Sequence, residues 1–183
     1  MMLPLKFSAH AALLALSLAA TFAVTAPAYA GTAPGNARTT VIRSVSFVIN
    51  GNLDFGTVIG GTTAGTVTIS NKGTRSRTGG ITLANGGGHK PATFSGQATV
   101  NQMFKISAGA SSISLTGPGA PMRVRNFVIG TAGGTTLGNA PLTIWNNYPN
   151  GIFGFNVGAT LDVGANQAPG KYTGTWSITL NYV

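Results

Sequence analysis

The chain has 183 residues, with eleven lysines and arginines against two acidic residues, two histidines and no cysteine. This composition argues against an enzyme, because proton transfer, covalent catalysis and metal binding depend largely on the side chains that are scarce here. We therefore expect no catalytic residue, no metal site and no cofactor. The absence of cysteine also excludes disulfides, so strand pairing and core packing must hold the fold.

The first thirty residues have the features of a secretory signal peptide. Lys6 supplies a positive start, residues 11–24 are apolar, and an Ala-Tyr-Ala cleavage site ends at Ala30. We expect cleavage between Ala30 and Gly31 and a secreted mature chain, located in the periplasm, on the outer cell surface or in a fimbrium. In that mature chain we expect no transmembrane segment. Its positive charge makes an anionic surface glycan one candidate partner, and we expect no nucleic acid partner for a secreted chain.

The mature chain is predicted to consist of a flexible N-terminal segment, residues 31–38, and a single domain, residues 39–183. In this domain apolar and polar residues alternate, and glycine, proline and asparagine mark frequent turns, which is typical of a β-sandwich or barrel. The predicted strands lie, in chain order, around residues 45–49, 53–59, 67–69, 81–83, 104–106, 113–115, 124–129, 153–163 and 172–182. Residues 131–150 are the least regular part and are predicted to form a long loop or a poorly defined strand.

The two longest alternating runs close the sequence. In residues 153–163, and again in residues 172–182, every second residue is apolar or small, so each run has one face for a core and one for solvent. A connection rich in turn-forming residues, 164–170, separates them. We expect the two runs to be neighbouring antiparallel strands.

Two pairs of arginines and one histidine are the remaining residues whose side chains could bind a ligand or take part in catalysis. Arg75 and Arg77, like Arg123 and Arg125, are two residues apart, so each pair should share one face of a strand. We expect both pairs to be solvated on outward faces, with attraction to anionic envelope polymers as the alternative. His89 lies in a glycine-rich turn, where we expect it to be exposed and without a catalytic role.

Three stretches of the sequence resemble a known family. They are residues 52–58, residues 65–75 and residues 163–174, the last of which runs on to Tyr182. In this order they resemble the secreted bacterial family catalogued as domain of unknown function 4402, which is similar to spore coat protein U and to the pilin subunits of chaperone–usher fimbriae. The resemblance covers most of residues 40–183.

The resemblance implies an immunoglobulin-like, pilin-like antiparallel β-sandwich, with Tyr172 at the position of the corner tyrosine of such folds. It also implies a non-enzymatic structural subunit of the cell envelope, a fimbrial subunit or adhesin. The sequence stops directly after its strongest run, so we expect the sandwich to lack its last strand and a neighbouring subunit to complete it. The implied partners are other pilin-like subunits, a periplasmic chaperone and an usher. The candidate assembly strand is the C-terminal run, with these residues on its apolar face: Tyr172, Gly174, Trp176, Ile178, Leu180 and Tyr182.

Two features depart from the pilin pattern. A pilin has a donor extension before its first strand, but here only a short polar segment precedes the first alternating run. If residues 39–49 are themselves the donor, Arg43 interrupts their apolar face. The disulfide of many pilins is also impossible in this chain. A tip subunit, an anchor and a self-complete domain are therefore alternatives to a polymerising subunit.

The alternative function is a self-contained, lectin-like binding module. Trp145 and Tyr148 lie in the irregular segment 141–153, where exposed aromatic side chains could stack on sugar rings. The competing interpretation is that Trp145 and Phe153 cover one end of the core.

Overall fold

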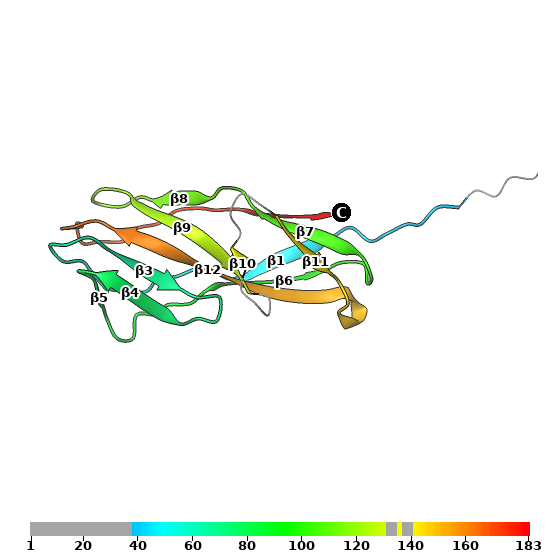
Figure 1. The fold of residues 1–183 in the computed structure, drawn as a ribbon, viewed down its shortest axis with the longest axis horizontal. Coiled ribbons are helices and arrows are strands. Elements are labelled where there is room, and N and C mark those ends of the chain that lie inside the picture. Colours follow the sequence, from blue (N-terminus) through cyan, green and yellow to red (C-terminus); the bar gives the residue numbers. More distant parts are fainter. Residues whose placement is uncertain (1–37, 131–134, 137–140) are drawn as a thin grey trace, which may run out of the picture. The chain divides into compact units, whose positions relative to one another are not determined.

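A computed structural model describes residues 38–130, 135–136 and 141–183 of the chain (Figure 1). The chain divides into two units, Met1–Thr39 and Thr40–Val183, and the fold described here is that of the second unit. The predicted signal peptide and its cleavage site at Ala30 and Gly31 lie outside the described residues. Among the residues that are described, no helix is long and apolar enough to cross a membrane.

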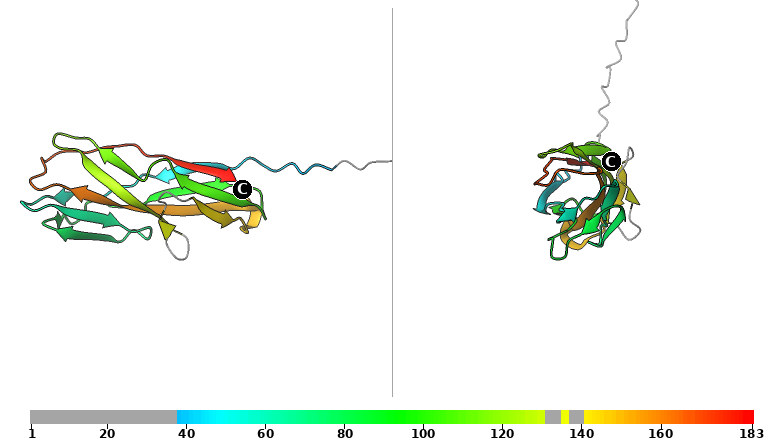
Figure 2. Two further views of the ribbon diagram at one scale, coloured as in Figure 1. Left: turned by 45° about the horizontal axis from the view of Figure 1, so that its top comes forward. Right: turned by 90° about the vertical axis from the view of Figure 1, so that its left-hand side faces the viewer.

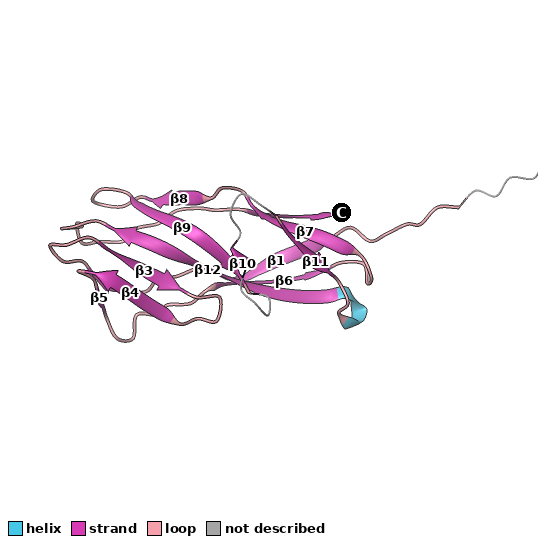
Figure 3. Cartoon of the chain, in the orientation of Figure 1, coloured by secondary structure: helices cyan, strands magenta, loops and turns pink. Residues whose placement is uncertain are grey.

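The described part of the chain is all-β, as predicted (Figure 3). Apart from one 3₁₀ turn, η1 (Pro149–Gly151), every regular element is a strand. The strands are β1 (Ser46–Gly51), β2 (Val58–Ile59), β3 (Gly65–Ile69), β4 (Arg75–Gly79), β5 (Thr82–Leu83), β6 (Ala92–Gln97), β7 (Met103–Ala108), β8 (Ser112–Leu115), β9 (Met122–Ile129), β10 (Thr135–Thr136), β11 (Leu142–Trp145), β12 (Ile152–Val163) and β13 (Ile178–Tyr182). All the pairings between these strands are antiparallel.

Two antiparallel sheets enclose the core, which confirms the predicted β-sandwich. The larger sheet has eight strands, with β1-β6-β12-β3-β4 in order and with β9 also paired to β12. Strands β8 and β10 pair with the other edge of β9. The smaller sheet has the order β11-β7-β13, and β2 and β5 form a separate ribbon. In the end-on view of Figure 2, the strands of the sandwich curl around a common centre.

Strand β12 holds the larger sheet together. Its first half pairs with β6 and its second half with β3, while β9 pairs with residues of β12 that span both halves. Val157, near the middle, has register partners on both sides, Ala92 of β6 and Ile129 of β9. Residues 157–161 are all buried, so this part of β12 is covered on both faces. A strand in this position satisfies its backbone donors and acceptors along both edges.

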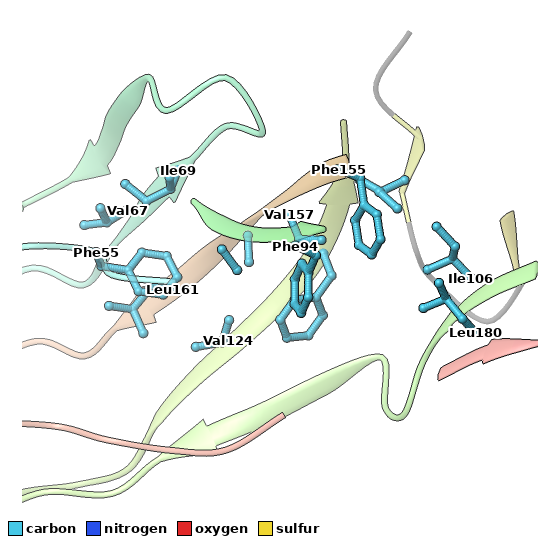
Figure 4. Close-up of a cluster of buried hydrophobic side chains, with 14 of the residues drawn as sticks. Phe55, Val67, Ile69, Phe94, Ile106, Val124, Phe155, Val157, Leu161 and Leu180 are labelled. Carbon is cyan, nitrogen blue, oxygen red and sulfur yellow. The ribbon is translucent and has the colours of Figure 1, made fainter. Parts of the chain in front are cut away.

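The core lies between the two sheets and is almost entirely aliphatic and aromatic. Figure 4 shows side chains of the larger sheet, among them Phe94, Phe155 and Val157, in one continuous cluster with Ile106 and Leu180 of the smaller sheet. Phe94 stacks on Phe155 with ring centroids 5.0 Å apart. Burying a side chain of this size stabilises the fold by about 1.5–3 kcal/mol. This burial takes the place of the disulfides that the composition excludes.

Several predicted elements need correction. The runs 153–163 and 172–182 are not paired neighbours, because β12 belongs to the larger sheet and β13 pairs with β7 in the smaller one. Of the second run, only residues 178–182 form a regular strand. Residues 131–150 were predicted to form a long loop or a poorly defined strand, and within them Leu142–Trp145 forms β11 and pairs with β7. Strands β4 and β6 were missing from the prediction.

Tyr172 has the hydrogen bonds of a corner tyrosine. Its hydroxyl donates to the carbonyl oxygen of Ala168, 2.9 Å away, and accepts from the backbone N–H of Gly119 at 3.0 Å. The side-chain amide of Gln167 donates to the same hydroxyl at 2.8 Å. One hydroxyl thus joins the connection after β12 to the loop between β8 and β9.

Replacing Tyr172 by phenylalanine should lower the free energy of unfolding by about 1–3 kcal/mol, since the substitution leaves partly buried donors and an acceptor without their partner. Urea denaturation of the purified protein measures this change. The control is Tyr148→Phe at an exposed position, where the change should stay below about 0.5 kcal/mol. Equal effects of the two substitutions would contradict the role given to the Tyr172 hydroxyl.

Candidate functional site

The terminal strands β1 and β13 leave part of the core uncovered. In the described structure each is the last strand of its sheet and pairs on one edge only, β1 with β6 and β13 with β7. The other edge of each strand presents backbone N–H and C=O groups that have no partner in a ladder. We call the region between these two edges the open seam, and define it by Phe47 and Ile49 of β1 and by Trp176 and Ile178 of the C-terminal run.

On β1, the side chains that face the core are only partly covered. Ile49 is the register partner of Phe94 and Phe47 that of Gly96, so both side chains lie on the core side of the sheet. Phe47 is half-buried, and Ile49 is 50% exposed. In the centre of the same sheet, inward-facing residues such as Val157 are fully buried. An inward-facing isoleucine with this exposure marks a core that the chain covers incompletely.

The C-terminal run forms the other side of the open seam. Trp176 stacks on Phe127 with ring centroids 5.0 Å apart and meets Phe94 edge-on at 5.9 Å. Trp176 and Ile178 are half-buried, although both pack against the core. Before β13, the run meets the segment around β8 through the Thr116–Thr173 bridge and a bond from Gly109 to Ser177.

The two sides of the open seam are joined by side chains and not by a strand ladder. The Phe94 ring touches Phe47 from β1 at a centroid distance of 6.2 Å and Trp176 from the C-terminal run. At the other end, the Tyr182 hydroxyl donates to the carbonyl oxygen of Arg43, 2.7 Å away, and accepts from Thr99 N–H. The left view of Figure 2 accordingly shows β1 and the C-terminal strand close together. The two edges therefore run antiparallel along the seam.

Strand β4, the other end of the larger sheet, has a protected edge. Arg75 and Arg77 are register partners of the buried residues Ile69 and Val67, so they lie on the core-side face of β4. The guanidinium of Arg75 donates to three carbonyl oxygens, those of Phe55, Thr57 and Ala84. The prediction of an outward face is therefore wrong for this pair, although Arg77 is exposed as predicted and Arg75 is half-buried. Inward charges blunt an edge strand against pairing, and β1 and β13 contain no charged residue.

Arg123 and Arg125 lie on the outer face of β9, as predicted, since they alternate with the buried residues Met122 and Val124. Arg125 pairs with Asp162 through its Nε, 2.9 Å from Oδ2. This side-chain hydrogen bond, together with the charge of Asp162, raises the pKa of Arg125 above its ordinary value, while desolvation acts weakly in the opposite direction. The pair is part-exposed, so it contributes little to stability.

The two aspartates and the one histidine that the structure describes lie in different parts of the fold. Asp54 accepts a bond from Gly56 N–H in the loop before β2, His89 is exposed in the loop before β6, and Asp162 lies on β12. No cluster of three potential metal ligands occurs among the described residues. Two hollows of about 240 and 350 Å³ lie in the described surface, and their linings contain no ionisable side chain.

Trp145 points away from the core. It is 54% exposed and pairs with Met103 on the outer face of β7, while its neighbour Asn146 is fully buried. The Asn146 side chain donates to the carbonyl oxygens of Ala98 and Thr99, which fixes the end of β11. The interpretation that Trp145 and Phe153 together cover one end of the core is therefore wrong for Trp145, whereas Phe153 is buried. Tyr148 is exposed in the turn that follows β11.

Of the six candidate assembly residues in the C-terminal run, three lie in a regular strand and three do not. Ile178, Leu180 and Tyr182 belong to β13 and face the core beside β7, whereas Tyr172, Gly174 and Trp176 lie in the non-regular part before it. The sequence did not indicate β1 as the other side of an open seam. An alternating pattern shows which face of a strand is apolar, but it does not show which edge lacks a neighbour.

The fold defines an antiparallel β-sandwich domain in which the terminal strands β1 and β13 border the open seam. A family model matches residues 45–182, and the chain belongs to that family, which is described as "Domain of unknown function (DUF4402)". The resemblance inferred from the three sequence stretches is thus confirmed. No curated protein and no solved structure gave a match to the chain.

Because the chain contains no cysteine, single cysteines can report the exposure of the open seam. In the monomeric protein, Ile49→Cys should react with a maleimide at least roughly tenfold faster than Val157→Cys, which requires local opening of the core. Reaction rates followed by mass spectrometry measure the difference. Similar rates at both positions would show that the seam is closed in solution.

Proposed function

We propose that this protein is a non-enzymatic structural subunit of the bacterial cell envelope, pilin-like or fimbrial, that assembles by accepting a strand. The observation that carries the proposal is the open seam, in which two unpaired sheet edges flank core side chains that remain half-exposed. A strand from another subunit would pair with these edges through its backbone and bury Ile49 and its neighbours with alternate side chains.

Charge and edge protection support this proposal. The larger sheet ends at β4 with two inward arginines and at β1 with the uncharged sequence Ser-Phe-Val-Ile-Asn-Gly. The bulge in β1 lies between Ile49 and Gly51, so Ser46 to Ile49 offer a regular edge. Long, uncharged and regular edges are those at which additional strands pair.

The proposed setting follows from the sequence. The signal peptide predicted for residues 1–30 would deliver the chain across the inner membrane, where a periplasmic chaperone would cover the open seam until an usher or another subunit replaced it. In this proposal the mature protein resides in a fimbrium or on the outer cell surface. Its partners are other pilin-like subunits, and the chemistry is that of backbone pairing and not of catalysis.

The proposal predicts a heat-sensitive ladder of multimers in unboiled gels of cell-surface extracts, detected with an antibody to the mature chain. Ile49→Lys should abolish the ladder, because a charge on the core side of β1 opposes burial under an added strand. The matched control is Val48→Lys, a substitution of the residue that precedes Ile49 in the same strand. Val48 is 62% exposed and faces outward, so this substitution should leave the ladder intact.

Both variants are compared by circular dichroism and urea denaturation before the gels are interpreted, because the control requires two folded proteins. A single monomer band from the unmodified protein would reject the structural subunit in favour of a self-contained surface binding module. Loss of the ladder with both substitutions would reject the open seam as the site of assembly.

A further inference from the structure

The outer face of the smaller sheet carries a row of exposed apolar side chains that the core does not use. Trp145 of β11 pairs with Met103 of β7, and Val183 follows β13 and donates its N–H to the Met103 carbonyl oxygen, 3.1 Å away. The three residues therefore form one row across the three strands. Trp145 is 54%, Met103 41% and Val183 66% exposed. Adjacent strands are about 4.8 Å apart, so the row extends over roughly 10 Å.

The next row on the same face consists of polar side chains. Lys105 pairs with Thr143 of β11 on one side and with Asn181 of β13 on the other, and all three are exposed. Because Lys105 is two residues after Met103, the two rows are adjacent on one face. An exposed indole thus lies beside an ammonium group, a hydroxyl and an amide on a rigid, hydrogen-bonded sheet.

The positive charge of this face is not compensated by the chain itself. The full sequence has only two acidic side chains. Asp162 is paired with Arg125 on the larger sheet, and Asp54 accepts a bond from Gly56 N–H in the loop before β2. Among the described residues the ion pair is that of Arg125 with Asp162, so Lys105 forms none there. An anionic ligand would supply one.

We propose that the outer face of β11-β7-β13 binds an acidic polysaccharide that contains uronate residues. A sugar ring has an apolar C–H face, which packs on the Trp145 indole, and hydroxyl groups at its edge, which bond to Thr143 and Asn181. The uronate carboxylate pairs with Lys105. Several rings in succession cover the row from Trp145 to Val183. This site is independent of strand assembly, because a strand added beside β13 extends the smaller sheet and leaves its outer face open.

Charge favours a polysaccharide over a second copy of the chain on this face. Two copies of this strongly basic chain repel one another, and a symmetric contact would bring Lys105 towards its own equivalent. A polyanion, by contrast, is attracted to the positive charge that makes two copies repel each other. The apolar row is also flanked by exposed polar groups, which a ligand rich in hydroxyls satisfies.

The test is the binding of polygalacturonate to the purified protein, followed by tryptophan fluorescence and by isothermal titration. Trp145→Ala should weaken binding about tenfold and remove the fluorescence change, with Trp176 still present as the second tryptophan. Trp145→Phe, which keeps an aromatic ring, should recover part of the affinity. Lys105→Ala should weaken binding about fivefold. The matched control is Lys72→Ala, an exposed lysine in the turn after β3, which should have no effect.

Two further probes separate ring recognition from charge alone. Cellohexaose has sugar rings without a carboxylate and polyaspartate has carboxylates without rings, and each should bind more weakly than polygalacturonate. Absence of saturable binding to polygalacturonate would overturn the proposal, as would equal losses from Lys105→Ala and Lys72→Ala. A dimer that Trp145→Ala converts to a monomer in sedimentation analysis would assign this face to a second copy instead.

Discussion

The fold depends on the double pairing of β12. This strand of twelve residues is hydrogen-bonded to β6 and β3 along one edge and to β9 along the other, and its central residues are buried on both faces. In a chain without disulfides and with a single ion pair among its described residues, such pairing and the burial it brings supply the stability. The other strands of the larger sheet pair either with β12 itself or with a strand that does.

The two ends of the larger sheet differ, although each lies two strands from β12. At one end, Arg75 lies on the core-side face of β4 and bonds to three carbonyl oxygens, so that edge strand carries an inward charge. At the other end, β1 offers no charged residue and leaves Ile49 half-exposed opposite the C-terminal run. Protection of one edge and exposure of the other is the arrangement that directed strand addition requires, because only one side of the sheet then accepts a partner.

Alternation and turn residues are local signals, so they predicted the all-β class. The resemblance of three stretches to a known family predicted the family and the corner position of Tyr172. The sequence did not predict β6, since Ala-Thr-Phe-Ser-Gly-Gln has one large apolar residue, and the importance of Phe94 comes from its contacts with Phe155, Phe47 and Trp176. Spacing placed Arg75 and Arg77 on one face but gave the wrong face. The open seam and the row from Trp145 to Val183 both depend on which strands are neighbours, and alternation contains no information on that.

Hydrogen exchange of the backbone amides, compared between the monomer and the protein extracted in assembled form, tests the central claim most directly. If a strand fills the open seam, the free-edge amides of β1 and of Ile178–Tyr182 exchange rapidly in the monomer and become protected on assembly. Amides of β12 are protected in both forms, which makes them the internal reference. Identical exchange of β1 and β13 in the two forms would contradict completion by an added strand.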